Sequence, residues 1–398
     1  MRLLLIGHDA NRAGAQLVLL YLMRLLKAEG IRMHLLLGEG GPLEADYRAL
    51  APLTIWPATN SHLVSRNADK VLGKLGLWKQ QARRKTRQQQ RLIARELHLD
   101  GVDAVLVNTV SSAQWLRQLP LRPDVPVIAY LHELTMSVQM YTQPDDLRYL
   151  FGRAQHLLTV SQATADFYQS RFNVPAERTT LFTLIDVDTI QQRVAEAQNR
   201  RGPTTALPGL ADVPADAVVV GGCGNAEWRK GNDLFVALAR MINQLPGPFV
   251  YFVWVGMPPS TLRDDLWHDV EKAGLADRVR FIEPTADVLR YIARFDVFLL
   301  CSREDPYPLV VLEAGASQVP VVCFAGAGGA PELIEADGGA VVPYLDLGAM
   351  AAALRELANN EPLRRRQGQQ LAHKIDQRHN SQTSLHHLLD LLTELTTA

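Results

Sequence analysis

The chain has 398 residues, of which 47 % are hydrophobic and 21 % charged, and its formal net charge is −1. This length exceeds what one hydrophobic core usually supports, so two domains are expected, and the near-zero charge gives no general argument for nucleic-acid binding. The three cysteines form no CxxC motif and have no histidine at metal-ligand spacing. The sequence therefore predicts neither a disulfide framework nor a zinc site.

The N-terminus predicts a buried strand. Its apolar run, Leu3 to Ile6, stops at Gly7 and is too short for a signal peptide. The longest stretch without charges, 314–331, is interrupted by Pro320 and by glycines, so it cannot form a membrane-spanning helix. We therefore expect a cytoplasmic protein that is at most attached to a membrane surface.

Short β-rich runs alternate with helical patterns along residues 1–198, which predicts a parallel sheet with crossover helices. A helix is expected over 15–28. The expected strands of this first domain are 2–6, 33–37, 104–107, 127–131 and 157–160.

The alternation restarts after 199–216, a segment rich in Pro, Gly and polar residues that reads as a linker. A second domain, 217–375, should contain a helix over 232–243 and strands at 217–222, 250–255, 279–282, 297–300 and 321–324. A last amphipathic helix lies within 376–398, where the leucines at 385, 388, 389, 392 and 395 share one face. The expected fold class is α/β, with two doubly wound Rossmann-like domains facing across a cleft and ligands at the carboxyl ends of the strands.

One segment, 62–98, is strongly basic. It contains ten Lys or Arg against Asp69 and Glu96, a net charge of +8, which leaves −9 for the rest of the chain. A solvated helical excursion is one interpretation. The other is a basic surface for anionic lipid or a lipid-linked phosphate, since each charge near a bilayer contributes about 1 kcal/mol. Nucleic acid is not expected as a partner, because Trp78 is the only aromatic side chain available for base stacking.

Two acids, Asp305 and Glu313, stand eight positions apart, with seven residues between them, in "REDPYPLVVLEAGAS". The pattern predicts a strand, a turn and then a helix with Pro308 in its first turn, so Asp305 sits at the strand end and Glu313 further along the helix. Carboxylates accept paired hydroxyl hydrogen bonds, which favours a sugar or ribose, and the helix N-terminus favours a phosphate. The alternative is structural: Asp305 caps the helix and Glu313 forms a surface salt bridge.

This block resembles the signature of the retaining glycosyltransferase family four, the group-one type with GT-B architecture. The resemblance implies that Asp305 lies against the transferred sugar and that Glu313 holds the ribose hydroxyls of the nucleotide. Pro306 and Pro308 stand where the family usually has glycines. Phosphate contacts then fall to the residues between and after the two prolines, Tyr307, Leu309 and Val310.

Three further segments are similar to those of this family. In "WRKGND", Arg229 and Lys230 would neutralise the donor diphosphate. In "NRAGAQ", Gly14 and Ala15 would open a helix whose N–H groups meet a phosphate or an acceptor. In "VIAYLHEL", His132 would contact the donor sugar. From the residues alone two alternatives remain: Gly14 and Ala15 form a plain loop-to-helix junction, and His132 is a structural histidine.

The resemblance implies a glycosyltransferase that moves a sugar from a nucleotide-sugar to a glycan or lipid-linked acceptor with retention of configuration. No metal or other cofactor is expected, because no acid pair such as D-x-D stands at a suitable strand end. The family's last helix often returns to the N-terminal domain, and 376–398 is expected to do so. Two alternatives stay open: a nucleotide-sugar epimerase on the same fold, and a non-catalytic partner that binds a nucleotide-sugar or another glycosyltransferase.

Overall fold

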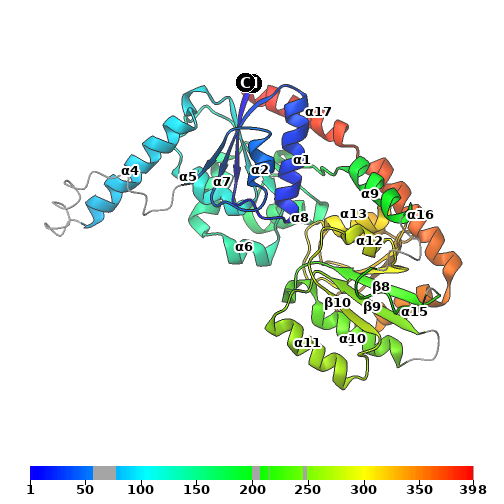
Figure 1. The fold of residues 1–398 in the computed structure, drawn as a ribbon. Helices are drawn as coiled ribbons and strands as arrows, with labels where there is room; N and C mark the ends of the chain where they lie inside the picture. Colours follow the sequence, from blue (N-terminus) through cyan, green and yellow to red (C-terminus); the bar gives the residue numbers. More distant parts are fainter. Residues whose placement is uncertain (57–77, 200–206, 215, 245–248, 398) are drawn as a thin grey trace. The chain divides into compact units, whose positions relative to one another are not determined.

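The computed structural model describes residues 1–56, 78–199, 207–214, 216–244 and 249–397 (Figure 1). The chain forms two compact units. Unit 1 consists of Met1–Val160, Ala165–Leu184 and Gln382–Ala398, and unit 2 of Ser161–Thr164 and Ile185–Ser381. Each unit is built on a parallel sheet with helices on both faces, which confirms the predicted fold class of two Rossmann-like domains.

The sheet of unit 1 has seven parallel strands. In spatial order they are β3 (Leu53–Ile55), β2 (Arg32–Leu37), β1 (Arg2–Gly7), β4 (Ala104–Asn108), β5 (Val127–Leu131), β6 (His156–Thr159) and β7 (Thr179–Leu181). Leu3, Leu4, Leu5 and Ile6 of β1 are all fully buried, because helices cover both faces of the sheet. The pairs Ile6↔Val107 and Asn108↔Tyr130 align the carboxyl ends of β1, β4 and β5 along one edge.

The helices of unit 1 follow the strands in the expected alternation. They are α1 (Gly14–Ala28), α2 (Glu44–Arg48), α4 (Trp78–Glu96), α5 (Ala113–Gln118), α6 (Thr135–Tyr141), α7 (Pro144–Arg153), α8 (Gln162–Phe172) and α17 (Ser381–Thr397). Short 3₁₀ turns lie at Leu99–Gly101, Val110–Ser112 and Ala176–Arg178.

Unit 2 contains a six-stranded parallel sheet. In spatial order its strands are β10 (Val279–Ile282), β9 (Val250–Val255), β8 (Val218–Cys223), β11 (Val297–Leu300), β12 (Val321–Phe324) and β13 (Gly339–Val342). Its helices are α9 (Val187–Asn199), α10 (Asn232–Asn243), α11 (Thr261–Lys272), α12 (Val288–Ile292), α13 (Leu309–Ala316), α14 (Ala330–Ile334), α15 (Leu347–Asn359) and α16 (Glu361–Arg378). A 3₁₀ turn at Trp228–Lys230 precedes α10.

Alternation along the strands divides the core of unit 2 between the two faces of the sheet. Phe252 and Trp254 of β9 pack with α10 and α15 on one face, whereas Tyr251 and Val253 pack with α12 and α13 on the other. Successive strand residues point to opposite faces, so a strand buried on both sides reads as a continuous apolar run. This explains why the central strands of this sheet were recognisable in the sequence.

The segment around the predicted linker differs from the expectation. Helix α9, which the sequence analysis assigned to the first domain, belongs to unit 2, where it packs against α12 and α13. Leu207, Leu210 and Val213 are buried in the core of unit 2, and the Tyr291 hydroxyl donates to the Pro208 carbonyl at 3.1 Å. The described part of 199–216 is therefore packed; residues 200–206 and 215 lie outside the described residues.

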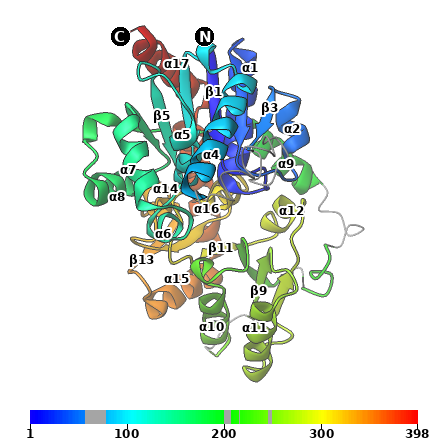
Figure 2. The same ribbon diagram turned by 90° about the vertical axis from the view of Figure 1, so that its left-hand side faces the viewer.

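The last helix, α17, is part of unit 1. Leu385, Leu388 and Leu392 are buried, and the Ser384 hydroxyl donates to the Thr183 carbonyl at 2.9 Å. Figures 1 and 2 both show α17 beside the sheet of unit 1.

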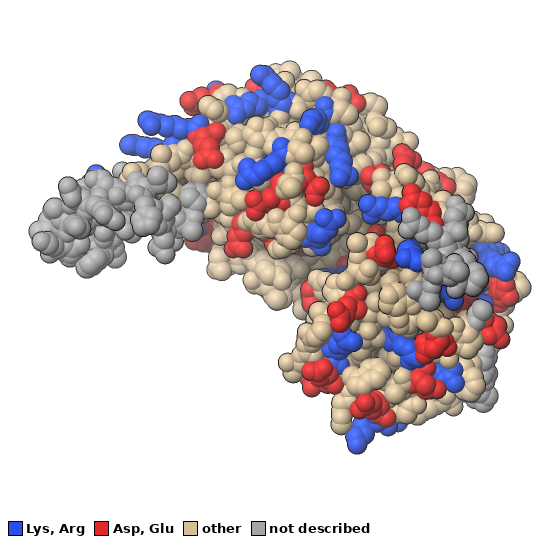
Figure 3. Space-filling model, in the orientation of Figure 1, with Lys and Arg blue, Asp and Glu red and all other residues tan. Residues whose placement is uncertain are grey.

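The basic segment 62–98 is described only from residue 78 onward, so its first part lies outside the described residues. Helix α4 carries seven Lys or Arg against Glu96. In Figure 3, Lys and Arg side chains project where α4 lies in Figure 1. Among the described residues, every helix is too short or too polar to cross a bilayer.

Candidate active site

Lys230 and Arg229 lie in the turn that follows β8 in unit 2. This turn ends at Gly231, whose φ of +73° is in the left-handed region, and a Cβ there would approach the Cys301 carbonyl oxygen to 2.0 Å. Only glycine fits without a backbone shift, so the close approach of the turn to β11 fixes both basic side chains at the carboxyl edge of the sheet. The Lys230 ammonium then meets the Asp305 carboxylate at 2.7 Å.

Asp305 is nearly buried and faces the basic pair. One carboxylate oxygen accepts hydrogen bonds from Lys230 and, at 3.2 Å, from the Ser302 hydroxyl, and the other lies 3.6 Å from the Arg229 guanidinium. Its backbone is also anchored, because the Asp305 N–H donates to the Ala327 carbonyl at 2.7 Å. The capping alternative is wrong, since the N-cap of α13 is Pro308 and no side chain caps this helix. Asp305 is a partner of the basic pair.

A second basic group, which the sequence analysis missed, braces this arrangement. The Arg303 guanidinium donates to both oxygens of Asp233 at 2.8 and 2.7 Å and to the Trp228 carbonyl at 2.8 Å. It also stacks 4.2 Å from the centre of the Trp228 ring. A bidentate arginine pair restricts geometry as well as adding energy, so Arg303 locks the Trp228–Lys230 turn to the β11–α13 loop. The signal available in the sequence was an arginine three residues after the end of β11.

Glu313 is half-buried on the side of α13 that faces the end of β8. Burial raises the pKa of its carboxyl to about 7, and the positive charge of Arg193 on α9 opposes this shift. Burial likewise raises the pKa of the Cys223 thiol to about 12, with Glu313 acting in the same direction and Lys230 against it. The charges of Glu313 and Lys230 both act on the pKa of the Cys223 thiol, so both side chains lie near the last residue of β8.

The N-terminus of α13 lies between the two acids, as predicted. Leu309 and Val310 are its first two residues, so their N–H groups have no carbonyl partner within the helix. The Tyr307 side chain instead contacts His379: its ring stacks on the His379 ring, and its hydroxyl lies 2.8 Å from the His379 Nε2. Of the three residues expected at a phosphate, Leu309 and Val310 therefore offer backbone donors directly at the helix end.

In unit 1, α1 begins at Gly14, close to the predicted start. Gly14 is exposed and Ala15 half-buried, whereas Gln16 is buried and donates to Asp9 at 2.5 Å. The same Gln16 amide nitrogen lies 2.9 Å from the His8 Nε2. These contacts hold the loop after β1 against the first turn of α1.

His132 stands at the carboxyl end of β5, as predicted. The Asn108 amide donates to the Ala15 carbonyl at 3.2 Å, so its oxygen faces the ring and accepts from His132 Nε2 at 2.9 Å. The other ring nitrogen, Nδ1, then remains an acceptor. Burial lowers the pKa of His132 to about 3, and the nearby His8 acts in the same direction. His132 is therefore a neutral imidazole at physiological pH.

A hydrogen-bonded chain runs behind His132. His8 Nδ1 lies 3.1 Å from the Thr109 hydroxyl, which in turn bonds to Glu133. Glu133 also accepts from the N–H groups of His132 at 3.0 Å and Val110 at 3.2 Å, and burial raises its pKa to about 7. Thr109 has a φ of +76°, a conformation rare for a β-branched residue, which the chain of contacts holds in place. Its signal in the sequence was the polar pair Asn108–Thr109 directly after a buried strand.

The predicted residues thus form two groups, each at the carboxyl edge of its own sheet. Lys230, Arg229, Asp305 and Glu313 belong to unit 2, and Gly14, Ala15 and His132 to unit 1. Among the described residues, no three His, Cys, Asp or Glu side chains are grouped as a metal site would require.

Comparison with known proteins identifies the family. A model described as "Glycosyltransferase Family 4" matches residues 12–183, and one described as "Glycosyl transferases group 1" matches residues 216–360. The two matches cover both units and contain every residue of the two groups. The chain belongs to the family-four, group-one glycosyltransferases.

Solved structures resemble this chain over nearly its whole length. HepE of Anabaena, solved in complex with UDP and glucose, superposes with a TM-score of 0.73 at 19 % identity, over 99 % of this chain and 100 % of that one. Sucrose-phosphate synthase from Thermosynechococcus elongatus gives a TM-score of 0.74 at 19 % identity, over 100 % and 99 % of the two chains. These likenesses confirm the GT-B fold.

Curated relatives of the glycosyltransferase match over shorter regions. The lipopolysaccharide core biosynthesis glycosyltransferase LpsE of Rhizobium meliloti is 31 % identical over 155 residues, 39 % of this chain and 44 % of that protein. A D-inositol 3-phosphate glycosyltransferase of Saccharomonospora viridis is 30 % identical over 211 residues, 50 % of this chain and 49 % of that protein. The chain thus spans less than half the length of these relatives.

Proposed function

We propose that this protein transfers a sugar from a nucleotide-sugar donor to a glycan or lipid-linked acceptor with retention of configuration. The observation that carries the proposal is the arrangement in unit 2, where Lys230 and Arg229 are held on Asp305 beside Glu313 and the N-terminus of α13. Two cations, free helical N–H groups and a carboxylate are the groups needed to hold a diphosphate and a diol.

In this proposal, Lys230 and Arg229 exchange their contact with Asp305 for the donor diphosphate. They would then stabilise the charge that grows on the leaving group as the glycosidic bond to the donor breaks, together with the N–H groups of Leu309 and Val310. Glu313 would accept the ribose hydroxyls. Such fixed donors favour the transition state more than the ground state, because the charge they meet develops only during bond breaking.

Asp305 and His132 are assigned to the transferred sugar, as the resemblance implies. The Asp305 carboxylate already accepts from Lys230 and Ser302, which suits a group that positions sugar hydroxyls rather than a free nucleophile. Neutral His132 would accept a hydroxyl hydrogen bond at Nδ1, and Gly14 and Ala15 would present N–H groups to the acceptor. We propose that no metal is needed, because the two cations of unit 2 meet the diphosphate charge; full activity in EDTA is the expected result.

The names of the relatives support a substrate class. HepE was solved with UDP and with UDP-glucose, and LpsE bears a name that assigns it to lipopolysaccharide core biosynthesis. We therefore propose a hexosyl donor and an acceptor from polysaccharide or lipopolysaccharide biosynthesis.

The first test is a thermal-shift panel of nucleoside diphosphates. A ligand at about 100 times its dissociation constant stabilises the protein by roughly 2.7 kcal/mol, so the matching base gives a clear shift. The selected nucleotide-sugar is then incubated with and without candidate acceptors. Release of nucleoside diphosphate only when the acceptor is present, with the sugar joined to it, supports transfer.

The same assay separates the alternatives. An epimerase would convert the donor sugar in the absence of an acceptor. A non-catalytic partner would show the thermal shift but would not release nucleoside diphosphate with any acceptor.

We also propose that the basic segment 62–98 brings the protein to anionic membranes. The charge of α4 supports this, since polybasic surfaces are attracted to anionic lipid. Replacing Arg83, Arg84 and Lys85 by Glu is expected to weaken binding to phosphatidylglycerol vesicles, and the wild-type binding should fall with added salt. If the unchanged protein ignores these vesicles at low salt, the segment is only a solvated surface.

The matched control reverses three exposed cations of unit 2: Lys272 of α11 and Arg365 and Arg366 of α16. It makes the same change in net charge. Vesicle binding that falls equally in the control would show that total charge, not the α4 segment, drives the interaction.

A further inference from the structure

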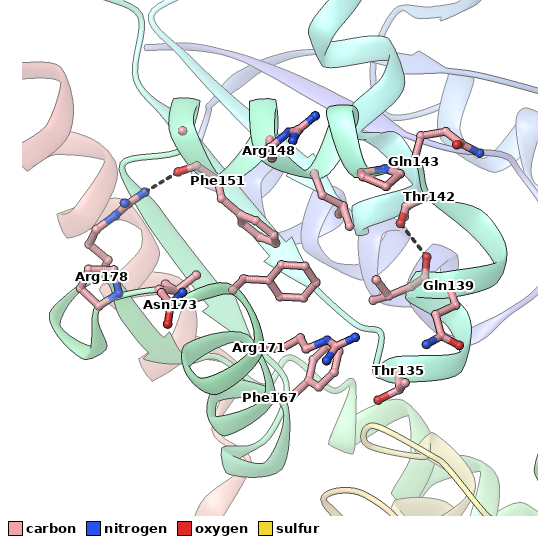
Figure 4. Close-up of a pocket in the computed structure, with 17 residues that line it drawn as sticks. Thr135, Gln139, Thr142, Gln143, Arg148, Phe151, Phe167, Arg171, Asn173 and Arg178 are labelled. Atoms are coloured by element: carbon pink, nitrogen blue, oxygen red, sulfur yellow. Dashed lines mark hydrogen bonds between the residues drawn. The ribbon is translucent and has the colours of Figure 1, made fainter.

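A pocket of about 790 Å³ lies in unit 1 between α6, α7 and α8. Figures 1 and 2 show these three helices side by side, and Figure 4 shows the residues that line the space between them. None of the residues assigned above to donor or acceptor lines it. Its volume is in the range of sites for small organic ligands, and such sites are mostly apolar with a few placed polar groups.

One wall of the pocket is aromatic. Phe151 of α7 and Phe167 and Phe172 of α8 are only half-buried, although they pack on one another and on fully buried Tyr168. Phe172 lies 5.0 Å from Phe151 and 5.8 Å from Phe167 between ring centres. Figure 4 shows the Phe151 and Phe167 rings turned toward the cavity. A wall of mutually packed rings offers apolar area at little further cost in side-chain entropy.

The charged part of the lining is cationic, and uncharged polar side chains accompany it. Three arginines and no acidic residue line the pocket. The Arg178 guanidinium is fixed by the carbonyls of Phe151, Ala154 and Gln155, and Arg148 pairs with an acid outside the lining. The side chain of exposed Arg171, on the turn after Phe167, makes no hydrogen bond or ion pair with another described residue.

We propose that this pocket binds an anionic amphiphile, a carboxylate or phosphate monoester bearing one hydrocarbon chain. The hydrocarbon chain of the ligand lies against Phe151, Phe167 and Phe172, and Arg171 holds its anionic head group. The combination of aromatic wall, cationic lining and absent acid selects this chemistry over a neutral lipid or a cation. Met140 and Tyr141, at the end of α6, are exposed apolar residues that stand in the chain between two residues of the lining, Gln139 and Thr142.

The probes are hexyl, octyl and decyl phosphate, measured by calorimetry with the full chain below the concentrations at which they aggregate. One site per chain is expected, and each added methylene should tighten the dissociation constant about three- to fourfold until the pocket is filled. Decanol should bind more weakly than decyl phosphate, and inorganic phosphate should not bind. Absence of saturable binding by decyl phosphate, or binding without a chain-length trend, would overturn the proposal.

Two substitutions place the site. Arg171→Gln should weaken decyl phosphate about ten- to a hundredfold and leave decanol unchanged, because it removes charged hydrogen bonds. Gly152→Leu should weaken both probes, since Gly152 lines the pocket and a Cβ there would meet no atom within 4 Å. The control is Arg24→Gln, which removes an exposed arginine of α1.

Melting curves show whether each variant is folded, and nucleoside diphosphate binding provides a readout that does not involve the pocket. If folded Arg171→Gln and Gly152→Leu bind decyl phosphate like the control, the ligand sits elsewhere and the assignment fails. A further arm uses phosphatidylglycerol vesicles: binding to vesicles but not to monomeric decyl phosphate would indicate a membrane-surface contact and would also overturn the pocket site. The nucleotide-sugar proposal is unaffected by either outcome.

Discussion

Replacing Glu313 by Gln should stabilise the fold at neutral and higher pH while weakening donor binding. The carboxyl has a pKa of about 7 in the folded chain and an ordinary value of 4.5. Between these values the unfolded chain loses this proton while the folded chain keeps it, so wild-type stability falls as pH rises from 4.5 to 7. A difference of this size corresponds to about 3 kcal/mol at full burial, and to about 2 kcal/mol for a half-buried side chain.

The glutamine has no proton to lose, so the variant should lack this fall. Its free energy of unfolding should exceed that of the wild type only slightly at pH 5 and by about 2 kcal/mol at pH 8. Glu133 has a raised pKa as well and imposes the same trend from unit 1. The comparison is therefore made between the two proteins at each pH, which cancels the contribution of Glu133.

Binding should change in the opposite direction. A carboxylate accepts both ribose hydroxyls, whereas an amide presents one acceptor, so nucleoside diphosphate affinity should fall roughly ten- to a hundredfold. Because the nucleotide prefers the ionised form, its binding to the wild type at pH 6.5 should release a proton. Glu313→Gln should reduce that release by the share that comes from this carboxyl, and the terminal phosphate of the nucleotide, whose second pKa is about 6, supplies the rest.

Urea unfolding at pH 5 and pH 8 measures the first effect, and calorimetry in two buffers of different ionisation enthalpy measures the second. The control is Glu356→Gln, an exposed position on α15 with the same chemical change. A variant that is less stable than wild type at pH 8, or that binds nucleoside diphosphate as tightly, would refute the placement of Glu313 as a half-buried ribose acceptor.

Three other outcomes are expected. Lys230→Ala should lower turnover at saturating donor more than it lowers donor affinity, because the charge it meets grows during bond breaking; steady-state kinetics and calorimetry together would show the reverse if the lysine acts only in binding. Asp305→Asn should alter the choice of donor sugar and keep or raise affinity for free nucleoside diphosphate, since the phosphate no longer competes for Lys230; loss of that affinity in calorimetry would contradict the assignment. Gly231→Ala should cost more than Gly274→Ala in thermal unfolding, because both have φ near +70° but only the first would place a Cβ 2.0 Å from the Cys301 carbonyl; equal losses would mean that the turn is free to move.

The central strands were predictable because they are buried on both faces and therefore read as unbroken apolar runs. Three edge strands, β3, β7 and β13, were not recognised. Each pairs on one side only, and two of them have three residues, such as Leu53–Ile55, so their sequences carry too little apolar signal. The assignment of α9 also failed, because a hydrophobic stripe shows that a helix packs on something but not on which unit.

The positions of the candidate site residues were predictable where a polar residue directly follows a strand, as with His132, or where a family motif marks a strand, a turn and a helix, as with Asp305 and Glu313. What the sequence did not reveal is how these groups are held. The contact between Lys230 and Asp305 joins residues 75 positions apart. The Arg303–Asp233 brace and the chain from His8 to Glu133 depend in the same way on strand order, which local pattern does not encode.

The position of α17 has a consequence for synthesis. Leu385, Leu388 and Leu392 belong to the core of unit 1, although the ribosome makes them after all of unit 2. Unit 2 of a nascent chain can therefore fold while the apolar surface of unit 1 that α17 later covers is still exposed. Unit 1 is thus completed after unit 2, although most of its sequence is N-terminal. If the ribosome stalls before residue 381, the apolar surface of unit 1 that α17 would cover stays exposed, where chaperones can bind it or it can aggregate.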